Sequence, residues 1–276
     1  MNTTIGAYVP TNSFFHRVDP RLKLFAVVAF IVCVFLDYGS WALTFACNGA
    51  LFLIGFLTML MSGISPSSIL RSLKGLIVLV VFLLIINVFF PPMSSISDPG
   101  WIAFKIGDIN VYWESILQTL KILLRLVTMF TYTIILTGTT RPLDLNFSME
   151  WYMSPLKLIK VPVHIFSMMM SLALRFIPTL LDETKQLMRA QSSRGLDYNK
   201  GSIATKFRGI VALIVPLFVS AFTRSTELAN AMIARGYDPY AKRTRYRTLS
   251  FAWRDLFVLL YVLMALAGFI LLRVMF

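Results

Sequence analysis

Charged residues are scarce in this chain, and acidic residues, cysteine and histidine are the scarcest. Only 14% of the 276 residues are charged and 57% are hydrophobic, whereas about a quarter of the residues in a soluble domain are charged. This composition excludes an ordinary soluble domain and indicates a membrane protein. The first 21 residues lack the apolar core and small-residue cleavage site of a secretory signal peptide. We therefore expect the first membrane span to anchor the chain itself.

The few cysteine and histidine residues argue against metal and catalytic sites. Cys33 and Cys47 lie inside apolar runs and form no CxxC pair, which favours small buried side chains. His16 and His164 are far apart, and neither has a cysteine or carboxylate at ligand spacing. No nucleophile-elbow or oxyanion motif is present. We expect no metal site, no catalytic residues and no cofactor bound by this chain.

The net charge of +13 is concentrated in one region. Residues 141–247 hold 16 of the 26 Lys and Arg residues but only 7 of the 13 acids. In a membrane protein such an excess marks the cytoplasmic side. The interleaved aromatic residues are too apolar and too continuous for a base-stacking groove, so we expect no nucleic-acid partner.

Apolar runs predict about five transmembrane helices in an all-α membrane protein, because crossing a bilayer takes about 20 apolar residues. The predicted spans are Leu22–Leu36, Trp41–Met61, Leu76–Phe90, Ile116–Thr137 and Leu256–Leu272. Basic residues before the first span and between the second and third place the amino terminus inside. The region between the fourth and fifth spans then also lies inside.

Two cations lie within the fourth predicted span. Lys121 and Arg125 are four residues apart and share a helix face. They either line an ion or substrate path, or reach the membrane interface or a neighbouring helix. The second interpretation is the more frequent one for interfacial cations.

Two long helices are predicted between the fourth and fifth spans, over residues 163–194 and 203–235. Each begins apolar and ends polar, and each ends in Ala-x-x-x-Arg-Gly-[Leu/Tyr]-Asp, with the two motifs offset by 41 residues. Glycine just past the last turn closes a helix, and arginine faces the negative end of the helix dipole. A single copy is typical of a helix end, whereas two matched copies indicate two equivalent ends that meet two equivalent partners.

The matched ends predict that both long helices lie along the inner membrane face or dip into it, with apolar halves exposed to a partner. If each half crossed once, the two ends would lie on opposite sides. We therefore expect a membrane part over residues 1–137, a cytoplasmic-side coupling domain over 138–251, and a last transmembrane helix over 252–276. Methionine-rich surfaces suit a face that repacks against several partners.

Several ordered motifs together resemble one family. The opening Tyr8-Val9-Pro10-x-x-Ser13-x-x-His16-x-x-Asp19-Pro20-Arg21-x-Lys23 comes first, and Leu136-Thr137-x-Thr139-Thr140-x-Pro142-x-Asp144-Leu145 and Ala173-Leu174-Arg175-Phe176-Ile177-Pro178 follow. With the paired Arg-Gly ends, these motifs resemble the transmembrane T component of energy-coupling-factor transporters, a family that includes the T subunits of cobalt transporters. The resemblance covers nearly the whole chain.

The resemblance implies a non-catalytic subunit of a multi-pass complex in a prokaryotic cell membrane. Two ABC-type ATPases, identical or different, would hold ATP and Mg²⁺ and receive the ends Ser193-Arg194-Gly195 and Ala234-Arg235-Gly236. One or more substrate-binding S components, which take up a vitamin or metal ion, would contact a surface formed by Phe166, Met168, Met169, Met170, Leu172 and Pro178. Ser193 stands where the family pattern has Ala, which would make the two ends unequal.

Two other functions remain as alternatives. The permease of a conventional ABC importer has one Glu-Ala-Ala-type coupling loop, which this sequence lacks. A membrane scaffold without ATPase partners would expose the apolar surface, but it would have no use for two charged helix ends.

Overall fold

The computed structural model describes residues 8, 11, 13–89, 102–106, 109–195, 202–239, 241 and 252–275. Helix dominates these residues. The helices are η1 (Phe14–Arg17), α1 (Pro20–Phe35), α2 (Trp41–Met61), α3 (Ser67–Phe89), α5 (Trp113–Thr139), α6 (Pro142–Tyr152), η3 (Ser154–Ile159), α7 (Val163–Ser193), α8 (Ile203–Ala234) and α9 (Trp253–Met275). The prediction of an all-α membrane protein is confirmed.

A short antiparallel hairpin, which the sequence analysis did not predict, precedes α5. Strand β1 (Ile102–Ile106) pairs with β2 (Ile109–Tyr112), and β2 leads directly into α5. In β1 the residues Ile102, Phe104 and Ile106 alternate with Ala103 and Lys105, which is the period of a strand. The residues immediately before it, including Pro91 and Pro92, lie outside the described part of the chain.

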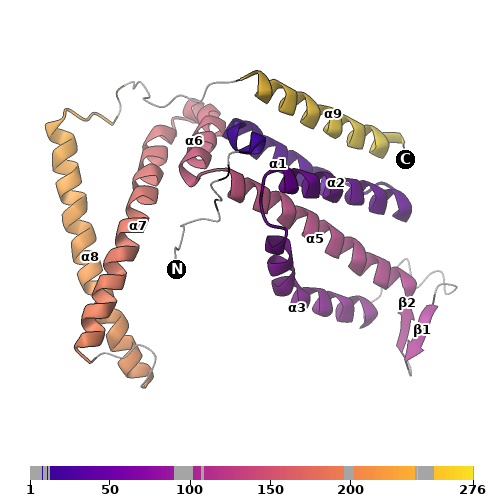
Figure 1. Cartoon of the computed structure of the whole chain (residues 1–276), viewed down its shortest axis with the longest axis horizontal. Helices are drawn as coiled ribbons and strands as arrows, with labels where there is room; N and C mark the ends of the chain where they lie inside the picture. The colour runs from indigo at the N-terminus through magenta and orange to yellow at the C-terminus, as the bar shows by residue number, and fades with distance from the viewer. Residues whose placement is uncertain are drawn as a thin grey trace. The chain divides into compact units, whose positions relative to one another are not determined.

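The chain forms two compact units, and the boundary falls within α6. One unit is Met1–Ser148 with Leu249–Phe276, and the other is Met149–Thr248. In the first unit α1, α2, α5 and α9 lie side by side, with α3 against α5 (Figure 1). Because α9 joins helices from the start of the chain, the first unit is closed by contacts between its two sequence ends.

The core of the first unit lies where α1, α2 and α5 meet. The Phe30 ring stacks on Tyr132 with centroids 5.0 Å apart, and the Tyr132 hydroxyl donates to the Leu51 carbonyl at 2.9 Å. At Gly55 a Cβ atom would lie only 3.3 Å from Thr131 and Tyr132. The absent side chain therefore permits close approach of α2 and α5.

Helix starts in this unit follow local capping rules. The Asp19 carboxylate accepts from the Arg21 amide at 2.9 Å, and Pro20 occupies the first helical position of α1. Ser40 caps α2 by accepting from the Leu43 amide at 3.3 Å. Both boundaries could therefore be predicted from the sequence.

Within the described part of the chain, five helices are long and apolar enough to cross a membrane. Three of them, α2, α5 and α9, contain the predicted spans Trp41–Met61, Ile116–Thr137 and Leu256–Leu272. The other two are α7 and the Lys206–Ala234 part of α8. The number of candidate spans agrees with the prediction, but α7 and α8 replace the predicted spans Leu22–Leu36 and Leu76–Phe90.

The difference has a physical reason in helix length. At 1.5 Å per residue the 16 residues of α1 extend only about 24 Å, which is less than a hydrocarbon core of about 30 Å. The apolar part of α3, Lys74–Asn87, is also short. An apolar segment of α7 or α8 meets the length criterion whether it crosses the bilayer or lies along it.

The second unit consists mainly of α7 and α8, which pack against each other (Figure 1). Both predicted long helices are present. Each contains an internal proline, Pro178 in α7 and Pro216 in α8. A proline removes one backbone hydrogen bond, so both helices carry the same local interruption before their polar halves.

Candidate docking ends of the two long helices

The first Arg-Gly motif forms the end of α7. Arg194 leaves the helix with φ −86° and ψ 8°, and Gly195 has φ +88°. The Gly195 amide donates to the Ser192 carbonyl at 3.0 Å. This left-handed conformation strains any residue with a Cβ atom, so the chain requires glycine here. Leu196 and Asp197, which complete the motif, lie outside the described residues.

The second motif ends α8 with the same backbone. Arg235 has φ −91° and ψ 9°, and Gly236 has φ +70°. The Gly236 amide donates to the Ile233 carbonyl at 2.9 Å, and the Tyr237 amide to the Met232 carbonyl at 3.0 Å. These two bonds form a Schellman closure. The repeated sequence therefore produces a repeated three-dimensional end.

Both ends project into solvent. Arg194, Gly195, Arg235 and Gly236 are all exposed, and no atom lies within 4 Å of a Cβ built on either glycine. Ser193 and Ala234 are exposed too, and the Ser193 hydroxyl donates to its own helix at the Arg189 carbonyl, 3.1 Å away. Among the described residues no carboxylate forms an ion pair with either arginine. Both ends are therefore accessible within the described part of the chain.

An ion pair joins α7 and α8 at equivalent positions of the repeat. Arg224 Nη2 lies 3.4 Å from Glu183 Oε2. These residues are 41 positions apart (224 − 183), the same offset as Arg194 and Arg235 (235 − 194). Two antiparallel repeats contact each other at equivalent positions only near a local twofold axis. The helix pair is therefore pseudo-symmetric about this contact.

Contacts nearer the helix ends fix the antiparallel direction. The Tyr237 hydroxyl, next to the second motif, donates to the Met168 sulfur near the start of α7, at 2.9 Å. In Figure 1 the two helices cross each other with opposed chain directions. Each motif arginine lies 11 residues beyond the Glu183–Arg224 contact, so the two ends are about 33 Å apart along the helix axes.

The residues of the predicted S-component surface differ in exposure. Phe166, Met169, Met170 and Pro178 are exposed, whereas Met168 and Leu172 are half-buried, with Met168 under Tyr237. On α8 several further large apolar residues are exposed: Phe207, Ile210, Val211, Ile214, Val215, Phe218, Val219 and Phe222. The unit thus exposes far more apolar surface than an ordinary soluble monomer does.

A buried carboxylate that the sequence analysis missed ties α6 to α7. Glu150 is 5% exposed, accepts from the Ser167 hydroxyl at 2.6 Å, and lies 3.7 Å from His164 Nδ1. No pattern in the sequence pointed to this contact, because α6 also carries Asp144, Asn146 and Ser148. His164 thus pairs with a structural carboxylate. Among the described residues no group of three or more His, Cys, Asp or Glu could hold a metal ion.

The motifs at the start of the chain and after α5 lie close together in space. Lys23 Nζ donates to the Thr139 carbonyl at 3.1 Å and to the His16 carbonyl at 3.3 Å. The charges of Asp144, Asp19 and Asp255 also act on this ammonium. These contacts and charges therefore link the start of α1 to the end of α5 and, through Asp255, to the start of α9.

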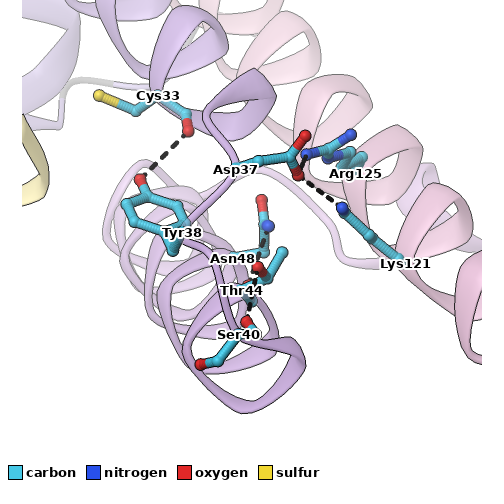
Figure 2. A network of polar contacts seen from close by, with 8 residues as sticks. All are labelled: Cys33, Asp37, Tyr38, Ser40, Thr44, Asn48, Lys121 and Arg125. Carbon is cyan, nitrogen blue, oxygen red and sulfur yellow. Dashed lines mark hydrogen bonds and ion pairs between the residues drawn. The ribbon is translucent and has the colours of Figure 1, made fainter. Parts of the chain in front are cut away.

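Lys121 and Arg125 both pair with Asp37, which lies in the turn between α1 and α2 (Figure 2). Arg125 Nη2 is 2.8 Å from Asp37 Oδ1, and Lys121 bonds to the same oxygen. The Lys121 bond is the main reason why the Asp37 pKa lies below its ordinary value. Of the two interpretations of these cations, the structure shows contact with a neighbouring element.

The described residues thus form an apolar helical bundle and a pair of long helices with two exposed Arg-Gly ends. The family model for "Cobalt transport protein" (CbiQ) matches residues 11–246. The energy-coupling factor transporter transmembrane protein EcfT of Bacillus subtilis (strain 168) is 41% identical over 268 residues, covering 96% of this chain and 97% of that protein. The protein of the same name from Brevibacillus brevis is 41% identical over 256 residues, covering 92% of each chain. The protein of the same name from Lactococcus lactis subsp. cremoris is 39% identical over 256 residues, covering 92% of this chain and 91% of that protein.

The chain therefore belongs to the family of energy-coupling-factor transporter transmembrane components. The resemblance identified from the motifs is confirmed, as is a multi-pass membrane protein with a role in transport.

Proposed function

We propose that this chain is the coupling subunit of an importer, transmitting the motion of two cytoplasmic ABC-type ATPases to a membrane-embedded, substrate-binding S component. The chain itself is non-catalytic. ATP and Mg²⁺ bind to the ATPases, and the S component determines which vitamin or metal ion is taken up. In this arrangement the amino terminus and the coupling domain, residues 138–251, are cytoplasmic.

The observation that carries the proposal is the pseudo-twofold arrangement of the two Arg-Gly ends. About 33 Å of helix axis lies between the two ends, which is more than the width of one side-chain pocket, and the ends have the same backbone geometry. Such a pair matches a dimer of identical or related subunits, each of which offers the same groove. Closing or opening of that dimer would move the two ends relative to each other.

The chemistry of each end suits docking to a protein. A guanidinium keeps its charge and offers five donors to carboxylates and carbonyls, and the glycine lets a partner backbone approach closely. Ser193-Arg194-Gly195 would enter one ATPase and Ala234-Arg235-Gly236 the other. Residues such as Phe166, Met169 and Met170 would contact the S component, whose membrane surface is apolar.

The test is co-purification from the native membrane in mild detergent, followed by mass spectrometry and an ATPase assay. We expect two ATPase subunits and at least one small membrane protein with the wild-type chain. Arg194→Ala and Arg235→Ala should each reduce ATPase recovery, because truncating one partner of a desolvated charge pair costs about 2 to 5 kcal/mol. Arg254→Ala, which removes an exposed arginine of α9, is the matched control.

Two outcomes contradict the proposal. Full ATPase recovery with the Arg194→Ala/Arg235→Ala double variant would show that the ends do not dock. Recovery of the wild-type chain alone, without ATP hydrolysis, would favour a scaffold.

A further inference from the structure

The short helix η3, between α6 and α7, exposes large apolar side chains at its end. Leu158 is 89% exposed and Ile159 is 77% exposed, and among the described residues no large apolar side chain is more exposed than Leu158. Trp151 and Met153, just before η3, are also exposed. We call residues 157–160 the η3 tip. Exposed apolar side chains that gather in one place mark an interaction site.

The backbone of the η3 tip is fixed by its own hydrogen bonds. The Lys160 amide donates to the Lys157 carbonyl at 3.0 Å, and the Val161 amide donates to the Leu156 carbonyl at 3.3 Å. A proline lies in the first turn of η3 and another lies directly before α7, and each restricts the chain. The exposed side chains therefore stand on a defined turn.

Lys160 occupies a backbone conformation that favours glycine. Its φ is 62° and its ψ is 19°, and in the described part of the chain it is the single residue other than glycine with positive φ. Gly195 and Gly236 take this conformation at the ends of α7 and α8. A lysine here strains the turn, and a strained residue on the surface indicates a role for its side chain.

The charge around the η3 tip is positive. Lys157 and Lys160 are exposed, and no acid occurs between Glu150, which is buried, and Asp182. The core of a protein interface is depleted in lysine. At a membrane surface, by contrast, a lysine keeps its ammonium among the headgroups while apolar neighbours enter the acyl region. The combination therefore favours an anionic lipid surface over a protein groove.

The chain keeps the η3 tip within reach of a bilayer. Helix α5 is long and apolar enough to span a membrane and ends at Thr139. The link from there to η3 consists of α6, whose 11 residues extend about 17 Å, and of residues 140, 141 and 153. The headgroup layer at that end of α5 is thus accessible to the tip.

We propose that the η3 tip inserts into the headgroup layer of the leaflet in which α5 ends and binds anionic phospholipid there. Leu158 and Ile159 enter between the acyl chains, and Lys157 and Lys160 contact the phosphates. The start of α7 is thereby held at the membrane surface. This anchor needs neither ATPase nor S component, so it stands or fails independently of the proposed function.

The test measures the depth of the tip in the full chain, reconstituted into vesicles. A nitroxide spin label on Leu158→Cys reports collisions with oxygen, which concentrates in the bilayer, and with a neutral nickel chelate, which stays in water. We expect high accessibility to oxygen and low accessibility to nickel. The label on Ala190→Cys, an exposed position in the polar half of α7, is the control and should show the reverse. Wild type is the labelling blank, because Cys33 and Cys47 are buried.

Two lysine variants in the Leu158→Cys chain test the role of charge. Phosphatidylglycerol, added to phosphatidylcholine vesicles, should raise the ratio of inserted to free label. Lys157→Gln and Lys160→Gly should each lower that ratio about fivefold, the size expected for one cation at an anionic surface. Lys185→Gln, which removes an exposed lysine of α7, is the matched control and should leave it unchanged.

Lys160→Gly also separates lipid binding from a structural role. Because glycine removes the strain at positive φ, its melting temperature in detergent should equal or exceed that of wild type, although insertion is weaker. Nickel accessibility at position 158 as high as at position 190 would overturn the proposal. Insertion that is the same with and without phosphatidylglycerol, and in both lysine variants, would do so too. Protection of the label only after ATPases or small membrane proteins are added would show a protein interface instead and would also overturn it.

Discussion

The backbone amide of Asp19 donates to the carboxylate of Asp255 at 2.9 Å, although 236 residues separate them. The second carboxylate oxygen accepts from the Ala252 amide at 2.8 Å, and Asp255 is only 2% exposed. One side chain thus caps the start of α9 and fixes the start of α1. The first and last helices are joined at the same end.

Loss of this carboxylate should destabilise the first unit. Asp255→Ala leaves the buried Asp19 amide and the partly buried Ala252 amide without this acceptor, and an unsatisfied buried group costs about 1 to 3 kcal/mol. We expect a clearly lower melting temperature in detergent. Asp255→Asn keeps one acceptor oxygen, so its melting temperature should fall less. Equal melting temperatures for all three proteins would show that the contact contributes nothing to stability.

Substitution of either motif glycine should destabilise its helix end because of the positive φ angle, since there is room for a Cβ atom at both positions. Gly195→Ala or Gly236→Ala places a Cβ atom at positive φ, which costs roughly 1 to 2 kcal/mol. The helix end should open and ATPase recovery should fall. Asparagine tolerates this conformation better, so Gly236→Asn should retain more binding than Gly236→Ala. If alanine binds better than asparagine, the left-handed closure is not what the partner recognises.

The Glu183–Arg224 pair should hold α7 and α8 in register. Both side chains are partly exposed, at 26% and 33%, so its contribution to stability is about 0.5 to 1 kcal/mol. Glu183→Arg or Arg224→Glu alone places like charges together and should lower the melting temperature. The double exchange restores an attractive pair. Additive losses in the double variant would contradict a direct interaction between these two residues.

The Asp37 tether should weaken in acid. Its folded-state pKa is lowered by Lys121, so the stabilisation is fully present above the unfolded value of about 3.9 and disappears as pH falls through the folded value. In neutral detergent without phospholipid, wild type should melt higher than Asp37→Asn between pH 5 and 8. The difference should shrink below about pH 4. A difference that persists unchanged at lower pH would rule out the charge as its cause.

Local features could be predicted from the sequence. The apolar segments predicted α2, α5 and α9, because the length of an apolar run and its polar flanks are enough to define a helix in a membrane. The ends at Arg194-Gly195 and Arg235-Gly236 were predictable because glycine after a polar last turn adopts the left-handed conformation. The hairpin before α5 was missed, since two strands of five and four residues give too short a periodic signal.

The sequence alone determined that this is a helical membrane protein with twin Arg-Gly helix ends, because hydrophobicity and glycine geometry act within a few residues. Only the tertiary structure decided that Asp37 pairs with Lys121 and Arg125, that Asp255 fixes Asp19, and that Glu183 meets Arg224 across a pseudo-twofold axis. These contacts join residues 41 to 236 positions apart. Such pairs form only when packing brings whole helices together, and no local pattern in the sequence reports them.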